Sequence, residues 1–372
     1  MSSIYIHIPF CKQACNYCNF HFSTTLNTVE EMTDAIVQEI KLRQNYIEDT
    51  IESIYFGGGT PSILTIKQLE DILTKVQETF PISKDVEITL EANPDDISSE
   101  KLKEWKQLGI NRFSLGVQSF FEEDLFWMNR AHNAFQAENS IKSLQDAGFH
   151  NITIDLIYGT PTLSDEKWRA NVQKAIDLNI PHLSCYALTV EPGTALDKMI
   201  QKHKKENVDS EKQARHFEQL MLWSSLSGYD HYEVSNFAKP GFRSRHNSSY
   251  WQGKHYLGVG PSAHSFNGKS RQWNIANNIR YIKEINKGIL PFEIEHLTPH
   301  QQLEEYIMTS LRTMEGLSLS FVEKNWNLGE AERILSESKE HIQTEKMIQK
   351  GDHLVLTDKG FLFADGIASD LF

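Results

Sequence analysis

The feature that most constrains the fold is an alternation of strand-like and helix-like segments that continues to about residue 200. Amphipathic stretches, in which apolar residues recur every three or four positions, separate short runs with β-type composition. These runs are predicted as strands over residues 3–8, 53–56, 86–91, 112–117, 152–157 and 182–188. Strands that are each followed by a helix pair in parallel. We therefore predict an α/β fold whose right-handed crossovers curl the sheet into a full or partial TIM-like (β/α) barrel.

In such a barrel, the loops that follow the strands converge at one end, and ligands bind there. The residues best suited to bind a ligand or take part in chemistry occupy these loops. A cysteine cluster follows the first strand, GGGTPS (57–62) the second and EANPDD (91–96) the third. Gln118 follows the fourth strand, and YGTP (158–161) and TVEPGT (189–194) follow the fifth and sixth. We therefore expect six loops to contribute to a single site.

The chain has 372 residues, which is enough for one large domain and a smaller one. We predict a barrel core over residues 1–200, an extension of the barrel over 201–300 and a small α+β domain over 301–372. The last domain reads as two helices and a hairpin at 353–363, an order that resembles a winged-helix module. Because this region has no concentrated Lys/Arg face, packing against the barrel is favoured over DNA binding.

Charge and hydropathy exclude several classes of function. The formal net charge is −13, which opposes general attraction to nucleic acid or anionic lipid. No apolar run approaches the roughly 20 residues that span a bilayer, and the N-terminal residues lack the basic and long apolar regions of a signal peptide. We expect a cytoplasmic protein. Since thiols stay reduced there, its four cysteines indicate metal binding or catalysis before disulfides.

Three of the four cysteines, Cys11, Cys15 and Cys18, form a CxxxCxxC motif. Thiolates are soft ligands that favour zinc or iron–sulfur clusters. A zinc site needs a fourth ligand, for which His7 or His21 is nearby. A [4Fe–4S] cluster normally takes four cysteines, so three leave one iron open to a small exchangeable ligand. Both alternatives follow from the motif alone.

CxxxCxxC after the first strand, combined with GGGTP after the second, resembles the radical S-adenosylmethionine (SAM) superfamily. The resemblance implies that the methionine amino and carboxylate groups of SAM chelate the open iron. It also implies that one-electron reduction of the sulfonium yields a 5′-deoxyadenosyl radical, and it disfavours zinc. Gly57, Gly58 and Gly59 would then let the backbone approach SAM, although a tight turn alone also requires glycine.

The longer patterns YIHIPFC, GGGTPS, EANPD, SLGVQSF, NRAHN and DLIYGTP are similar to the oxygen-independent coproporphyrinogen III oxidase family. The resemblance implies that Cys11, Cys15 and Cys18 ligate the cluster. It further implies SAM contacts from Tyr5, Tyr17, Gly58, Gly59, Thr60, Glu91, Gln118, Arg130, Asp155 and Ala187.

This family contains two functions. One is the oxidase, a radical enzyme that decarboxylates two propionates to give protoporphyrinogen. The other is a haem-binding chaperone of the HemW type, which is not expected to catalyse that reaction. The oxidase pattern continues CxxxCxxCxC, whereas this chain has Phe20 at the last position. The oxidase also has a substantial segment before its first strand, and this chain begins ten residues before Cys11. Both departures favour the chaperone branch, and no residue is assigned a catalytic role.

The segment HNSSYW matches the HNxxYW pattern that is associated with haem binding in the chaperone branch. It implies that His246, Asn247, Tyr250 and Trp251 bind haem, with a neutral imidazole as a suitable axial ligand. The alternative is a hydrogen-bonded histidine beside core aromatics. Haem as cargo and haem proteins of the respiratory chain as acceptors are the implied partners. Peripheral membrane association and a homodimer stay open, and the remaining cysteine, Cys185, is expected to be a buried structural thiol.

Overall fold

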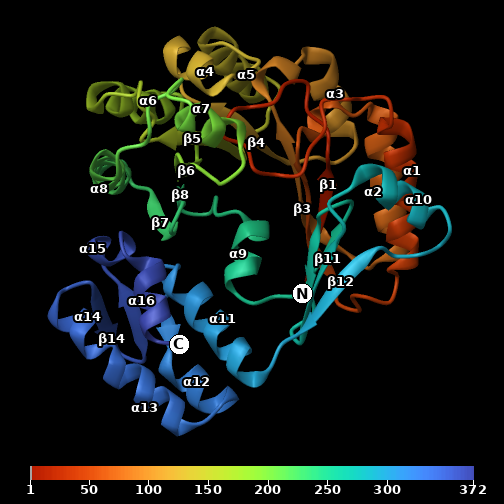
Figure 1. Cartoon of the computed structure of the whole chain (residues 1–372). Coiled ribbons are helices and arrows are strands. Elements are labelled where there is room, and N and C mark those ends of the chain that lie inside the picture. The colour runs from red at the N-terminus through yellow and green to blue at the C-terminus, as the bar shows by residue number, and fades with distance from the viewer. Residues whose placement is uncertain (1) are drawn as a thin grey trace.

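The computed structural model describes residues 2–372, and its centre is a parallel sheet (Figure 1). Six strands pair in chain order, each parallel to the next. They are β1 (Ser2–Ile8), β2 (Ile51–Gly58), β3 (Ile82–Ala92), β4 (Arg112–Gln118), β5 (Ile152–Tyr158) and β6 (His182–Ala187). All six predicted strands and the α/β fold class are thus confirmed.

Helices connect the strands, and several of them begin at a capping side chain. Thr65 and Asn133 each form a capping box with a glutamine three residues later, which satisfies free N–H groups at the helix start. The helices before residue 230 are α1 (Val29–Leu42), α2 (Ile66–Thr79), α3 (Ser99–Gln107), α4 (Glu122–Met128), α5 (Ala134–Asp146), α6 (Asp165–Asp177), α7 (Ala195–Gln201) and α8 (Ser210–Leu226). Two short 3₁₀ helices, Pro61–Ile63 and Pro94–Asp96, follow β2 and β3.

The sheet continues beyond the six parallel strands at both edges. At the β6 edge it adds β8 (Asn236–Ala238) and then β7 (Asp230–Glu233), both antiparallel. At the β1 edge it adds β9, which is parallel to β1, and then three antiparallel strands. These are β9 (Tyr256–Val259), β10 (His264–Phe266), β11 (Ser270–Asn274) and β12 (Phe292–His296), with α10 (Asn278–Ile285) between the last two. Within residues 2–372 the end strands β7 and β12 do not pair, so the barrel is partial.

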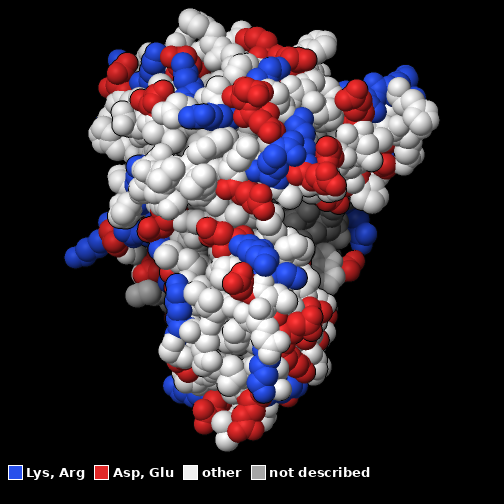
Figure 2. Space-filling model, turned by 90° about the vertical axis from the view of Figure 1, so that its left-hand side faces the viewer, with Lys and Arg blue, Asp and Glu red and all other residues white. Residues whose placement is uncertain are grey.

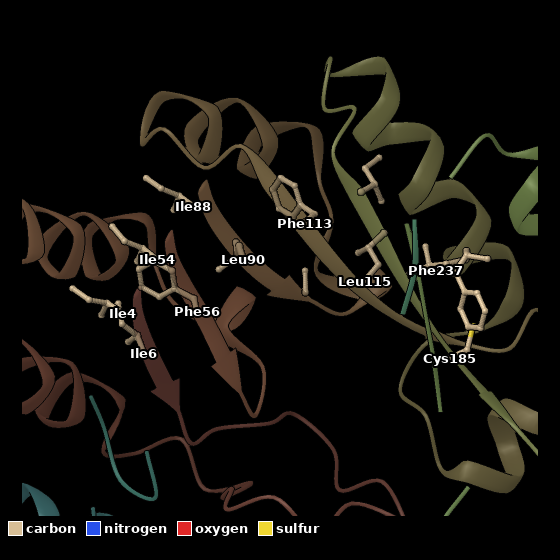
Figure 3. Close-up of a cluster of buried hydrophobic side chains, with 14 of the residues drawn as sticks. Ile4, Ile6, Ile54, Phe56, Ile88, Leu90, Phe113, Leu115, Cys185 and Phe237 are labelled. Atoms are coloured by element: carbon tan, nitrogen blue, oxygen red, sulfur yellow. The ribbon is translucent and has the colours of Figure 1, made fainter. Parts of the chain in front are cut away.

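The main hydrophobic core lies between the sheet and the surrounding helices. Alternate residues of each strand face the helices, and Figure 3 shows them gathered on that side. The labelled side chains are Ile4, Ile6, Ile54, Phe56, Ile88, Leu90, Phe113, Leu115, Cys185 and Phe237, all of which are buried. Cys185 is a free, buried thiol as expected. The intervening residues, which include Tyr55, Glu91 and Asp155, face the barrel interior, so that interior is rich in polar side chains.

The C-terminal region forms a separate lobe, drawn in blue in Figure 1. Its three-stranded antiparallel sheet has the order β13–β15–β14. The elements are α11 (Pro299–Leu311), β13 (Leu317–Ser318), α12 (Leu319–Asn325), α13 (Leu328–Glu337), α14 (Lys339–Gln343), β14 (Met347–Lys350), β15 (His353–Leu356), α15 (Asp358–Phe361) and α16 (Ala364–Asp370). The boundaries at residues 200 and 300 stay predictions, and strands on both sides of residue 200 share one sheet.

The hairpin predicted within residues 353–363 is wrong. Only its first half is a strand, and β15 pairs with the preceding β14. The second half turns into α15 because the Thr357 side chain accepts a hydrogen bond from the N–H of Gly360 and caps a helix there. The apolar residues after Thr357 therefore pack as a helix face.

The surface is mixed in charge where Figure 2 shows it, with acidic and basic side chains interspersed among uncharged ones over this face. In the described part of the chain, no helix has the length and apolarity to cross a bilayer.

Candidate functional site

A cavity of about 780 Å³ lies at the carboxyl ends of the parallel strands. Most of the residues predicted for cluster and SAM binding line it, although they come from the ends of different strands and from the loops that follow them. They are Cys11, Cys15, Tyr17, Cys18, Gly58, Gly59, Thr60, Glu91, Gln118, Arg130, Asp155 and Ala187. Tyr5 does not line the cavity, and its hydroxyl lies 3.2 Å from Nδ1 of His7. The four residues predicted for haem binding do not line it either.

The cysteine loop is held in place by contacts with the C-terminal end of α4. The Asn129 side chain donates to the carbonyl of Ala14 at 2.7 Å, and the Asn16 side chain donates to the carbonyl of Trp127 at 3.1 Å. Asn129 has a left-handed backbone (φ 58°), which ends α4 and turns its side chain toward the loop. The protein's own contacts therefore order this loop.

The three thiols are free and lie together on the loop that borders the cavity. Burial raises the pKa of Cys18 to about 11 and also raises that of Cys11, so both need a cation to become thiolates. In the part of the chain that the structure describes, no three His, Cys, Asp or Glu side chains are arranged to hold one metal ion. The two histidines considered for zinc have other partners, because Nε2 of His7 contacts the carbonyl of His21 (2.9 Å) and Nε2 of His21 contacts Oδ1 of Asn278 (2.7 Å).

The glycine loop has a structural requirement that the sequence did not reveal. A Cβ on Gly59 would lie 2.5 Å from the carbonyl oxygen of Phe10, and the N–H of Thr60 donates to the same oxygen at 2.7 Å. Gly58 has φ +108°, which favours glycine. The loop after β2 therefore supports the start of the cysteine loop, in addition to bordering the cavity.

Glu91 is the central carboxyl group of the cavity. Its Oε1 accepts from the hydroxyl of Tyr55 (2.7 Å), and its Oε2 accepts from the N–H of Gly58 (3.2 Å). Burial, with a contribution from Asp155, raises the pKa of Glu91 to about 8. Burial also raises the pKa of Asp155 to about 6, although Ser114 donates a hydrogen bond to it. A cationic ligand in this cavity would favour the charged forms of both groups.

Arg130 supplies the positive charge. Its guanidinium donates to Oδ1 of Asn93 (2.6 Å), to the carbonyl of Gly116 (2.7 Å) and to Sγ of Cys15 (3.2 Å). Its Nε is buried and has no hydrogen-bond partner among residues 2–372. A buried donor without a partner is costly, so Arg130 is held beside Cys15 with one of its hydrogen bonds unmade.

The opposite wall of the cavity was not predicted from the sequence. It is formed by α8, the turn between β7 and β8 and the C-terminal lobe, through Phe217, Val234, Arg312, Phe361 and Asp365 among others. Arg312 and Asp365 form an ion pair there. These residues belong to no local motif and reach the site only through tertiary packing, so no signal in the sequence could have identified them.

The segment predicted to bind haem forms α9 (Arg245–Trp251), which packs against β1, β2 and α11. His246 is only 1% exposed, and burial lowers its pKa to about 3. Its Nδ1 lies 3.0 Å from Oγ of Ser53, and its Nε2 lies 3.0 Å from the hydroxyl of Tyr250. Trp251 is half-buried beneath the guanidinium of Arg312, 5.4 Å from the ring centroid. Ligation of iron by His246 would therefore have to replace one of its present partners.

Comparisons with known proteins agree with this architecture. The Radical SAM superfamily matches residues 5–175, and the HemN C-terminal domain matches residues 297–363. The heme chaperone HemW of Lactococcus lactis is 33% identical, over 98% of this chain and 96% of its own length. The heme chaperone HemW of Bacillus subtilis is 36% identical, over 87% of each chain.

Among solved structures, coproporphyrinogen III oxidase (HemN) from Escherichia coli superposes with a TM-score of 0.86 at 23% identity. The match covers 100% of this chain and 89% of that one, and it establishes the shared fold. Together with the sequence matches, it leads to one assignment. The chain belongs to the radical SAM superfamily and, within its coproporphyrinogen III oxidase-like family, to the HemW branch.

Proposed function

We propose that this protein is a haem chaperone that binds haem and delivers it to haem proteins, on a scaffold that holds SAM and a [4Fe–4S] cluster. The proposed binding of SAM and the cluster is supported by one cavity that three cysteines, Glu91, Arg130 and Asp155 line together. The relatives that are named heme chaperones support haem as the molecule that is carried. Respiratory haem proteins as acceptors, and a cytoplasmic location, are parts of this proposal.

Cys11, Cys15 and Cys18 would hold the cluster, and Arg130 would remain beside the thiolate of Cys15. When bound, the cluster supplies an open iron that SAM can chelate and, after reduction, an electron for the sulfonium. Glu91 and Asp155 would accept hydrogen bonds from the ammonium or ribose hydroxyls of SAM. The partial barrel would keep these groups away from bulk water.

His246, Asn247, Tyr250 and Trp251 of α9 are the proposed haem contacts. Nε2 of His246 is the proposed axial ligand, and it would exchange the Tyr250 hydroxyl for iron. Trp251 offers an aromatic face for the porphyrin, because it is only partly buried. The SAM and cluster site would then act as a structural, redox or gating element for this segment.

Two measurements test the proposal. Anaerobic reconstitution should give the visible charge-transfer band of a [4Fe–4S] cluster, and stoichiometric zinc without iron would contradict the scaffold. Added haemin should show a shifted Soret band that His246→Ala or Trp251→Ala alters, and absence of any binding would contradict the cargo.

The alternative function is the oxidase reaction itself. Anaerobic incubation with SAM, a reductant and coproporphyrinogen III separates the two functions. We expect no protoporphyrinogen, since Phe20, an exposed residue on the cavity wall, stands where the oxidase pattern has a further cysteine. Formation of protoporphyrinogen at catalytic turnover would show that the protein is an oxidase, and it would contradict the chaperone function.

A further inference from the structure

A continuous chain of contacts connects the cavity with α9 through the barrel interior. The hydroxyl of Tyr55 donates to Oε1 of Glu91 at 2.7 Å. The Tyr55 ring stacks on the imidazole of His246, with centroids 4.8 Å apart and planes 24° apart. The imidazole in turn contacts the hydroxyl of Tyr250 through Nε2 at 3.0 Å. Tyr55 is thus the side chain that contacts both the cavity carboxyl group and the histidine of the haem segment.

The residues of this chain have little freedom to move separately. Tyr55 is 9% exposed and His246 is 1% exposed. His246 is also held from other directions, because Ser53 pairs with its Nδ1 and Glu87 accepts from its backbone N–H at 3.1 Å. Packed interiors respond to a displaced side chain by shifting its neighbours, since they contain few voids. A change in the position of the Tyr55 ring will therefore reach the imidazole.

A ligand in the cavity would compete for the same carboxyl oxygens. Both oxygens of Glu91 already accept hydrogen bonds, one from Tyr55 and one from the N–H of Gly58. The ammonium and ribose hydroxyls of SAM are donors of the kind that a carboxylate binds, and a charge-assisted bond is stronger than one from a neutral hydroxyl. A charge-assisted donor at Oε1 would share that oxygen with Tyr55, so SAM at Glu91 would weaken the bond from Tyr55.

We propose that Tyr55 is a positioning residue that couples the SAM cavity to the haem segment, so that SAM binding frees Nε2 of His246 and strengthens haem binding. This inference rests on the proposed function, because it takes SAM as the cavity ligand and haem as the ligand of α9. It adds to that function the sign of the effect of SAM on haem binding and the residue that transmits this effect. By linkage, haem must strengthen SAM binding by the same factor.

The test is a haemin titration of the cluster-loaded protein, followed by Soret absorbance, with and without saturating SAM. We expect SAM to tighten haemin binding at least about fivefold, within the usual range of coupling between sites. Haemin should tighten SAM binding, measured by calorimetry, by the same factor. Tyr55→Phe keeps the ring and its stacking but removes the hydroxyl. It should bind haemin with the same affinity whether or not SAM is present, because the ring no longer responds to a ligand at Glu91.

The matched control is Tyr229→Phe, which also removes a buried tyrosine hydroxyl but one that donates to the carbonyl of Ile180, outside the chain of contacts. It should retain the full coupling. A second readout, the ¹⁵N signals of the His246 ring without haem, should shift on SAM addition in the wild type and stay unchanged in Tyr55→Phe.

Two outcomes would overturn the coupling while leaving the proposed function intact: equal haemin affinity with and without SAM in the wild type, or undiminished coupling in Tyr55→Phe. Absence of haemin binding in every variant would overturn the proposed function itself.

Discussion

The cavity and α9 differ in how completely their polar groups are satisfied. In the cavity, burial raises the pKa of the Cys11 and Cys18 thiols, and Nε of Arg130 has no partner among residues 2–372. In α9, both ring nitrogens of His246 are hydrogen-bonded. The cavity is therefore prepared to receive a charged group, whereas α9 must rearrange before its histidine can bind iron. This difference makes the cavity the better-defined of the two proposed sites.

The largest expected effect concerns the cysteine loop. Cys15→Ala should remove almost all bound iron after anaerobic reconstitution, since two thiolates cannot hold the cluster against competing ligands. The far-UV circular dichroism should stay unchanged, because Asn129 and Asn16 hold this loop without metal. Cys185→Ala is the control and should keep its iron. Iron retained in Cys15→Ala would show that the cavity is not the cluster site.

The next effect concerns His246 of α9, whose two ring nitrogens are both hydrogen-bonded. His246→Ala should lower the free energy of unfolding by about 3 kcal/mol, because it opens space in the core and leaves Ser53 and Tyr250 with unpaired hydroxyls. His255→Ala, at a half-exposed position, should change it by less than about 0.5 kcal/mol. Urea denaturation measures both variants. An equally small change in both would mean that the packing around His246 is loose and that α9 needs no rearrangement.

A smaller effect tests whether the cavity loops support each other. Gly59→Ala places a Cβ 2.5 Å from the carbonyl oxygen of Phe10, so the cysteine loop must shift. We expect a loss of about 1–3 kcal/mol and slower iron loading. Gly366→Ala serves as the matched change, since its Cβ would meet no atom within 4 Å in α16, and it should stabilise the protein slightly. If Gly59→Ala loads iron as fast as the wild type, the two loops are independent.

Per pH unit, the smallest effect is expected from Glu91. Its pKa is raised to about 8 in the folded protein, above the 4.5 of the unfolded chain. The folded state therefore holds the proton more tightly, and stability without SAM should fall as the pH rises from about 4.5 to about 8. The slope from this one group cannot exceed about 1.4 kcal/mol per pH unit. Glu91→Gln should flatten this part of the stability profile. An unchanged profile would indicate that water in the cavity already solvates the carboxyl group.

The parts of the molecule that could be predicted are those in which local pattern and topology agree. The six parallel strands alternate with amphipathic helices, and the rule that loops converge at the carboxyl ends brought Cys11, Glu91 and Asp155 to one cavity. The predicted hairpin failed because Thr357 acts as a helix cap, which an apolar pattern does not reveal.

Two further features depend on contacts between distant residues. Arg312 reaches the cavity wall from α11, far along the chain, without any motif. Tyr55 lies on a strand among apolar residues and resembles an ordinary core aromatic, and only the structure shows that it faces the interior between Glu91 and His246. Such pairings arise from strand register and from the packing of α9 on the sheet, which no short segment of sequence encodes.

The most direct test of the chaperone function is a haem-transfer experiment. The cluster-loaded protein is charged with one equivalent of haemin, freed of excess haemin and mixed with an apo-form of a haem protein, and the Soret bands of donor and acceptor are followed. We predict that haem leaves this protein and appears in the acceptor with its native spectrum, and that His246→Ala carries less haem into the reaction. A protein that takes up no haemin, or that keeps its haem in the presence of excess acceptor, would contradict the account.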